Sequence, residues 1–221
     1  MKKLLTALML MLMAVLTGCG GGSEQGAPNV ETKTGEVQPV PVETAQAAPH
    51  SKILVAYFSR TGENYQVGWI EKGNTAIVAD MIAEAVDADE FEIVPVKPYP
   101  TNYKECTEVA KEELESNARP AIDGSIDLND YDTIFLGYPI WWSDMPPIIY
   151  TFLESNDFNG KTIIPFCTSA GNGMTGKEIH ISEIAKGATL KEGFGIEGKL
   201  AQENPNAVRP QVNQWLKSLG Y

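Results

Sequence analysis

Apolar residues in this chain gather in short runs that alternate with longer amphipathic segments. Four runs have the length of a β-strand and are almost continuously apolar, as expected of strands that are covered on both faces. These runs predict strands at residues 53–58, 91–96, 133–138 and 162–167, and a weaker fifth strand is predicted between residues 189 and 196.

The segments between the runs have helical periodicity. Apolar positions from 76 to 86 repeat at the spacing of one helix face, after Asn74 and Thr75, which are suited to cap the helix start. Strand and helix alternate five times, which predicts a doubly wound α/β domain with right-handed crossovers. Ligands of such domains bind at the carboxyl ends of the strands, where the winding reverses. The other helices are predicted at residues 103–117, 146–154, 178–186 and 210–219.

The N-terminal residues have a different pattern. Lys2 and Lys3 precede an apolar run at residues 4–16, which is typical of a secretory signal peptide and is short for a permanent membrane span. Small residues then precede Cys19, and this ending resembles the lipobox of bacterial lipoproteins. The resemblance implies removal of residues 1–18 and lipidation of Cys19, so that the protein is exported and anchored to a bacterial membrane. An ordinary cleaved signal or a short uncleaved anchor is the alternative.

A linker is predicted between Cys19 and residue 50. It contains four prolines, several glycines and no aromatic residue, so it buries too little apolar surface to offset the entropy of ordering. The remaining residues, 51–221, are enough for one domain with a sizeable core.

The charge argues against nucleic-acid binding, and the cysteine and histidine content argues against a metal site. The formal net charge is −12, whereas nucleic acid selects basic faces, so nucleic acid is not an expected partner. The excess acid is either a solvated surface or a means of attracting a basic redox partner. Cys106 lies in a predicted helix and Cys167 at a strand end, so no disulfide is expected between them. Ligand-spaced Cys, His and carboxylate clusters are missing from the sequence, so no metal site is predicted.

The loop after the first strand carries hydroxyls and glycine and leads to a helix start. It reads FSRTG at 58–62, and the helix begins at GNT, 73–75. Free N–H groups and the helix dipole at such a place suit a phosphate. With residues 63–73 removed, the string resembles the FMN-phosphate loop of flavodoxins.

We interpret residues 63–73 as an eleven-residue insertion that loops out and returns. The insertion leaves open whether Gly62 or Gly73 takes the glycine position of the family, and whether Asn64 competes with Asn74. An ordinary helix cap after a loop is the simpler interpretation of this segment alone.

Two adjacent tryptophans follow the third strand, in GYPIWWSDMPP at 137–147. Neighbouring side chains diverge, so at least one indole is expected to remain exposed, and an exposed aromatic needs a partner. A flat flavin ring would be such a partner, since offset stacking on an indole contributes roughly 0.5 to 1.5 kcal/mol beyond area burial. The segment resembles the flavin-contacting loop of flavodoxins. A core or interface patch is the alternative.

A third loop, TSAGNG at 168–173, follows the fourth strand. Its N–H groups are suited to the polar edge of an isoalloxazine, where charge builds up on reduction, although a plain loop would look the same. The three loops follow strands one, three and four, which are neighbours in the flavodoxin strand order 2-1-3-4-5 and therefore meet at one crevice.

The resemblance to the flavodoxin-like family, including its bacterial lipoproteins, implies a three-layer domain with a five-stranded parallel sheet and non-covalently bound FMN. It implies phosphate contacts from Ser59, Thr61, Asn74 and Thr75, with Arg60 as a further candidate. Contacts to the ring are implied for Pro139, Ile140, Trp141 and Trp142, and contacts to the pyrimidine edge for Thr168, Ser169, Gly171 and Gly173.

We expect an FMN oxidoreductase at the membrane surface that passes electrons to a small acceptor such as a quinone. The turn at 168–173 lacks an aromatic, which leaves space for a substrate beside the flavin. The loop at 139–145 lacks glycine, at which backbone rotation to stabilise a flavin radical is easiest, and this favours two-electron chemistry. The alternatives are a one-electron shuttle between protein partners and a flavin-free structural lipoprotein.

Overall fold

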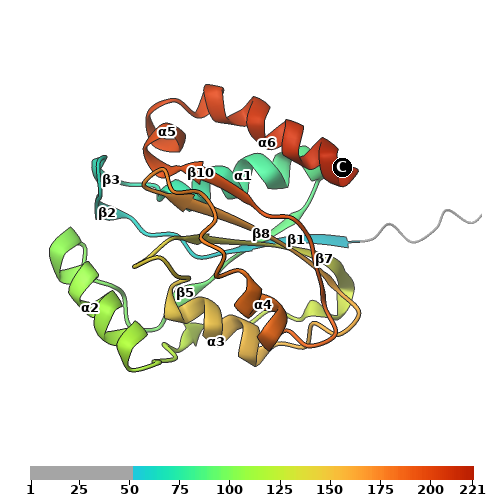
Figure 1. The fold of residues 1–221 in the computed structure, drawn as a ribbon, viewed down its shortest axis with the longest axis horizontal. Coiled ribbons are helices and arrows are strands. Elements are labelled where there is room, and N and C mark those ends of the chain that lie inside the picture. Colours follow the sequence, from blue (N-terminus) through green and yellow to red (C-terminus); the bar gives the residue numbers. More distant parts are fainter. Residues whose placement is uncertain (1–51) are drawn as a thin grey trace, which may run out of the picture. The chain divides into compact units, whose positions relative to one another are not determined.

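A central parallel sheet with helices on both faces makes up the part of the chain that the computed structural model describes, residues 52–221 (Figure 1). The strand order is β4-β1-β7-β8-β10, with a short β9 that also pairs with β8. This order confirms the predicted doubly wound α/β fold. The sheet strands are β1 (Lys52–Tyr57), β4 (Asp89–Glu92), β7 (Tyr131–Pro139), β8 (Thr162–Ser169), β9 (Thr189–Leu190) and β10 (Phe194–Glu197). The predicted signal peptide, Cys19 and linker lie outside the described residues.

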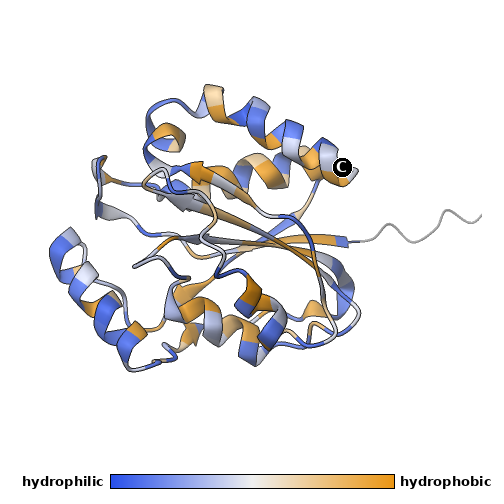
Figure 2. Ribbon diagram, viewed as in Figure 1, coloured by the Kyte–Doolittle hydropathy of each residue, from blue (hydrophilic) through white to orange (hydrophobic). Residues whose placement is uncertain are grey.

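Two hydrophobic cores flank the sheet, because alternate side chains of a strand point to opposite faces. Leu54 and Ala56 of β1 belong to one core and Val55 and Tyr57 to the other, and all four are buried. Figure 2 shows the apolar colouring concentrated on the strands and on the inner faces of the helices. One face is covered by α1 (Asn74–Val86), α5 (Gly198–Glu203) and α6 (Pro205–Leu219), and the other by α3 (Pro147–Ser155) and α4 (Ile179–Ile184). The 3₁₀ turn η1 (Leu128–Asp130) adds Leu128 to the core on the second face, and α2 (Tyr103–Glu115) lies on the same side, in contact with α3 and with β2 (Gly62–Asn64).

Two predicted strands differ from the observed ones. The second leaves the sheet after Glu92, and its remainder becomes β5 (Val94–Pro95), which pairs with β6 (Ile122–Asp123) in a separate antiparallel pair. The fifth is divided into β9 and β10 by the charged residues Lys191 and Glu192 and by Gly193. Both differences occur at the edges of the sheet, where fewer neighbours hold a strand in register.

The helices also differ from the prediction. Helix α6 begins at Pro205 rather than at Pro210, which lies within it, and α5 was not predicted. Asn74 and Thr75 do not cap α1, because Gly73 is the N-cap residue. Instead, the Ser59 hydroxyl accepts a hydrogen bond from the Ala76 N–H at 3.0 Å. No helix between residues 52 and 221 has both the length and the hydropathy that a bilayer span requires.

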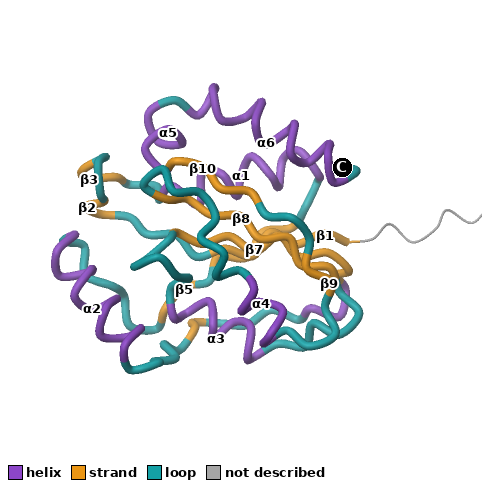
Figure 3. Tube along the Cα trace, viewed as in Figure 1, coloured by secondary structure: helices purple, strands orange, loops and turns teal. Residues whose placement is uncertain are grey.

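Residues 62–70 of the strand-to-helix connection form a hairpin, which covers most of the predicted insertion at 63–73. Strands β2 (Gly62–Asn64) and β3 (Gly68–Ile70) pair antiparallel, with Gly62 opposite Ile70 (Figure 3). The hairpin therefore returns the chain close to where it left, and α1 begins beside the end of β1.

Candidate functional site

A pocket of about 270 Å³ lies at the carboxyl ends of β1, β7 and β8. All three predicted loops contribute to its lining. The predicted site residues in the lining are Arg60, Asn74, Pro139, Ile140, Trp141, Trp142, Thr168 and Ser169. The others, which lie outside the lining, are Ser59, Thr61, Thr75, Gly171 and Gly173.

Gly73 is the glycine that the helix start requires. A Cβ at this position would lie 2.1 Å from Ser59 Oγ and 2.7 Å from the Arg60 carbonyl oxygen, so no other residue fits. Gly62 has a φ of +84° and instead packs against Thr101. The Asn64 amide donates to the carbonyls of Gly62 at 3.1 Å and Arg60 at 3.4 Å. The structure therefore places Gly73, rather than Gly62, directly before the helix. Asn74, rather than Asn64, is the first residue of the helix.

The first turn of α1 leaves two backbone N–H groups outside its intrahelical hydrogen bonds. The first intrahelical hydrogen bond runs from the Ile77 N–H to the Gly73 carbonyl at 3.2 Å, and the Ala76 N–H donates to Ser59 Oγ. The N–H groups of Asn74 and Thr75 precede these bonds and are available to a ligand. Asn74 Oδ1 is buried and finds no hydrogen-bond partner among residues 52–221, so a ligand hydroxyl would satisfy it.

Buried hydroxyls join this helix start to the fourth-strand loop. Thr75 Oγ1 and Thr168 Oγ1 are 2.8 Å apart, and both side chains are buried. Ser169 Oγ accepts the N–H groups of Gly171 at 3.2 Å and Gly173 at 3.0 Å, which fixes the turn after β8. Two of the predicted donors are therefore used within the turn itself in this structure.

The Arg60 guanidinium links two segments of the chain through hydrogen bonds to backbone carbonyls. It donates to the carbonyls of Pro100 at 2.7 and 3.2 Å and of Thr101 at 2.8 Å, and also to the carbonyl of Glu63. These bonds tie the hairpin to the segment before α2, a role that the sequence did not predict.

The turn at residues 141–144 is strained. Trp141 and Asp144 exchange two backbone hydrogen bonds of 2.9 Å, while Trp142 and Ser143 have φ values of +50° and +65°. A left-handed conformation costs a residue other than glycine about 1–2 kcal/mol, and such strain gathers at ligand sites. The prediction of an exposed indole is confirmed, since Trp142 is 60% exposed.

Each indole is held by a different neighbour. Trp141 is half-buried and packs edge-on against Phe58 and Tyr99, with ring centroids 5.4 and 4.9 Å apart. The Trp142 indole N–H donates to the Thr107 carbonyl in α2 at 3.0 Å. Trp141 therefore packs between the pocket and the core, and Trp142 lies at the rim of the pocket.

Part of the lining was missed by sequence reasoning. Gly198 and Lys199 directly follow β10, so the rule that sites lie after the sheet strands would have found them. Tyr65 of the hairpin stacks on Tyr103 of α2, with centroids 5.9 Å apart, and no local signal predicts that contact. The lining residues that were not predicted are Asn64, Tyr65, Gln66, Tyr103, Cys106, Thr107, Ala110, Ala170, Gly198 and Lys199.

The two cysteines of the described range are buried thiols. Cys106 and Cys167 are free and buried. Burial raises the pKa of Cys167 to about 12 and also raises the pKa of Cys106, so both remain thiols at neutral pH.

The comparisons with known proteins agree on one family. A family model described as Flavodoxin matches residues 52–218. A provisionally assigned flavoprotein from Bacteroides uniformis is 37% identical, with a TM-score of 0.61, over 76% of this chain and 98% of that chain. A second one, from Bacteroides eggerthii, is 32% identical, with a TM-score of 0.54, over 72% and 98% of the two chains.

A flavoprotein in complex with FMN from Lactobacillus acidophilus shares the fold. It is 23% identical, with a TM-score of 0.52, over 69% of this chain and 97% of that chain. No curated protein is significantly similar to this chain in sequence.

Proposed function

This chain belongs to the flavodoxin family, and on that basis we propose that it binds FMN without a covalent bond in the crevice between α1 and the turn at residues 141–144. One observation carries the proposal. The start of α1, the tryptophan turn and the end of β8 come from distant parts of the chain and line a single pocket.

The residues present fit the three parts of this cofactor. The N–H groups of Asn74 and Thr75 suit the phosphate, and the unpartnered Asn74 Oδ1 suits a hydroxyl of the ribityl chain. Lys199 and Arg60 supply the positive charge in the lining. The indoles of Trp141 and Trp142 would border the ring, and Ser169 and Ala170 would face its polar edge.

FMN supplies redox chemistry when it is bound, and this chain supplies position and electrostatics. We propose that electrons pass to a small acceptor, such as a quinone. The hairpin supports a small acceptor, because Tyr65 and its stacking partner Tyr103 give the pocket an aromatic wall against which a flat ring can pack. The two backbone hydrogen bonds across the glycine-free turn at 141–144 oppose backbone rotation there, which supports a preference for two-electron chemistry.

A one-electron shuttle is the second candidate. The net charge of −12 favours it, because an acidic surface steers a protein toward basic redox partners. We further propose that the chain works at the surface of a bacterial membrane, where lipidated Cys19 and the linker would hold it. The support for this location is the sequence before Cys19.

Titration of the purified protein with FMN tests the cofactor proposal. Trp142→Ala should weaken FMN affinity by about 2- to 12-fold, as expected for the loss of one stacking contact. Trp69→Ala is the matched control, because Trp69 is 63% exposed, much like Trp142, but does not line the pocket. A colourless protein that rejects added FMN would refute the proposal.

Reoxidation of the dithionite-reduced, FMN-loaded protein separates the two candidate functions. Rapid oxidation by a naphthoquinone, with two electrons and two protons transferred to give the quinol, supports the small acceptor. Slow reaction with the quinone, together with fast reaction with a basic one-electron protein acceptor, supports the shuttle.

A further inference from the structure

We infer that His180, acting through Tyr150 and Asp144, is a positioning residue that holds the turn at residues 141–144 in its strained conformation. The inferred effect of this turn on FMN rests on the function proposed above. The effect on Trp142 does not, because it concerns the protein alone.

A chain of hydrogen bonds connects α4 to the turn. Asp144 Oδ1 accepts from the Met145 N–H at 2.7 Å and from the Tyr150 hydroxyl in α3 at 2.9 Å. The same hydroxyl lies 2.9 Å from His180 Nδ1 in α4. A second cavity, of about 300 Å³, is lined by Asp144, Tyr150 and His180.

Counting protons assigns the direction of each bond. A carboxylate only accepts, and a tyrosine hydroxyl has one proton, so Tyr150 donates that proton to Asp144. Burial and the hydrogen bond to Asp144 both raise the pKa of Tyr150, which keeps its hydroxyl protonated. Nδ1 of His180 must therefore carry a hydrogen and donate it to Tyr150. The Nε2 atom then lies 4.0 Å from Glu183 Oε2.

The turn needs such an anchor because its backbone is strained. Trp142 and Ser143 both occupy left-handed conformations that cost about 1–2 kcal/mol each. The Asp144 side chain holds the end of the turn from within the second cavity, whereas Trp142 lines the first. A loss of this anchor should therefore move the Trp142 indole at the crevice rim.

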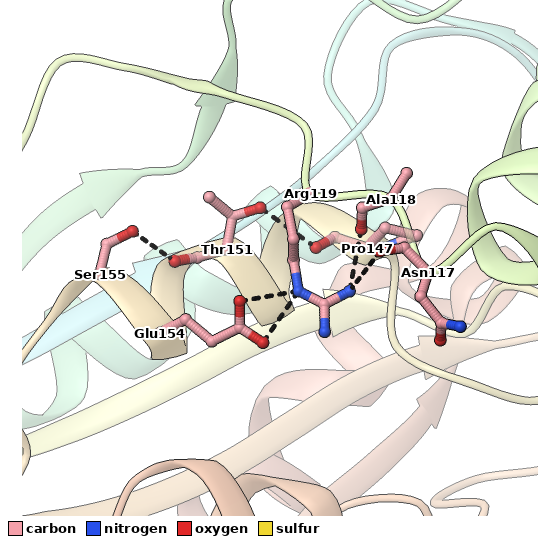
Figure 4. Close-up of polar contacts among 7 residues, drawn as sticks. All are labelled: Asn117, Ala118, Arg119, Pro147, Thr151, Glu154 and Ser155. Carbon is pink, nitrogen blue, oxygen red and sulfur yellow. Dashed lines mark hydrogen bonds and ion pairs between the residues drawn. The ribbon is translucent and has the colours of Figure 1, made fainter.

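Arg119, which also lines the second cavity, makes its hydrogen bonds to groups outside this network. Arg119 lies over the Tyr150 ring, 5.0 Å from its centroid. Its Nε donates to both carboxylate oxygens of Glu154, at 2.8 and 2.9 Å, and its Nη1 donates to the carbonyls of Asn117 and Ala118 (Figure 4). Arg119 therefore fixes the plane of Tyr150 without competing for Asp144. The remaining carboxylates lining the cavity are those of Glu113, which bonds Tyr99, and Glu183.

The test uses substitutions that differ in whether they donate a hydrogen bond. His180→Asn keeps a donor near the position of Nδ1, whereas His180→Leu removes it. Tyr150→Phe keeps the ring and removes the hydroxyl, and serves as a second variant if His180→Leu fails to fold. Ser182→Ala is the control, because it deletes a hydrogen bond within α4 that does not reach the turn.

The first measurement is the NMR resonance of the Trp142 indole N–H in the protein without cofactor, identified with Trp142→Phe. His180→Leu and Tyr150→Phe should shift this resonance, while His180→Asn and Ser182→Ala should not. In FMN titrations, His180→Leu should weaken binding by about 2- to 12-fold, the range for the loss of one net hydrogen bond.

An unshifted indole resonance in both His180→Leu and Tyr150→Phe would overturn the inference, as would identical behaviour of His180→Asn and His180→Leu. Failure of every form to bind FMN would refute the proposed function and leave the indole result to decide this inference alone.

Discussion

The hydroxyl oxygens of Thr75 and Thr168 lie 2.8 Å apart, although 93 residues separate the two threonines in the chain. Their side chains are only 1% and 3% exposed. The contact joins the first turn of α1 to the end of β8, so two of the loops proposed to hold FMN are connected to each other within the protein itself.

This contact should be detectable as a coupling energy. Thr75→Val or Thr168→Val alone leaves one buried hydroxyl unpaired, which should destabilise the protein by about 1–3 kcal/mol. The double variant removes both hydroxyls and should be less destabilised than the sum of the single variants. Urea unfolding of the four proteins measures the coupling, and strict additivity would show that the two hydroxyls do not interact.

Gly73→Ala should disrupt the proposed phosphate-binding site at the start of α1. The added methyl group would overlap Ser59 Oγ and the Arg60 carbonyl, so the start of α1 must shift away from β1. We expect a loss of stability greater than that of Gly124→Ala, together with a loss of FMN binding. Gly124 is the control because its φ of +83° costs about 1 kcal/mol but nothing lies within 4 Å of its added Cβ. Equal effects of the two substitutions on stability and FMN affinity would contradict this assignment.

The stability of the protein should depend on the ionisation of Glu113. Burial raises the pKa of Glu113, and the hydrogen bond from Tyr99 and the charge of Lys97 offset this only in part. A raised folded-state pKa means that the contribution of this group to stability is complete below the unfolded pKa and is lost as the pH rises through the folded pKa. Glu113→Gln should therefore be more stable than the original protein at neutral pH, with a difference that shrinks on acidification.

Glu154→Gln provides a control of opposite sign for the same urea titrations. The hydrogen bonds from Arg119 lower the pKa of Glu154, so its contribution is present above the unfolded pKa and is lost as the pH falls through the folded pKa. This substitution should slightly destabilise the protein at neutral pH. Parallel pH profiles for the two variants would refute the assignment of opposite shifts.

Lipidation at Cys19 has a direct readout. When the full chain is produced in a bacterium, we expect it in the membrane fraction with the added mass of acyl chains on Cys19. Cys19→Ser should remove that mass and release the protein, because each acyl methylene contributes roughly 0.8 kcal/mol to membrane attachment. An unmodified mature protein cleaved elsewhere would leave an ordinary signal peptide as the explanation.

The sequence alone determined the layered fold and the order of the loops at the site. The central strands β1, β7 and β8 were predictable because they are covered on both faces, and this requires nearly continuous apolar runs. Their loops were then predictable as neighbours, because parallel strands place their carboxyl ends at one edge. The edge strands β4 and β10 were predicted less well, because fewer neighbouring strands hold them in register.

Only the tertiary structure decided which residues complete the pocket and what holds them. Tyr65 and Tyr103 meet because Arg60 and Glu63 attach the hairpin to the start of α2, and those bonds run to backbone atoms about 40 residues away. Backbone carbonyl and N–H groups have no signature in the sequence, so their partners cannot be predicted from residue types. The apolar pattern specifies what is buried on each face, while the contacts between distant polar atoms are fixed only when the whole chain has folded.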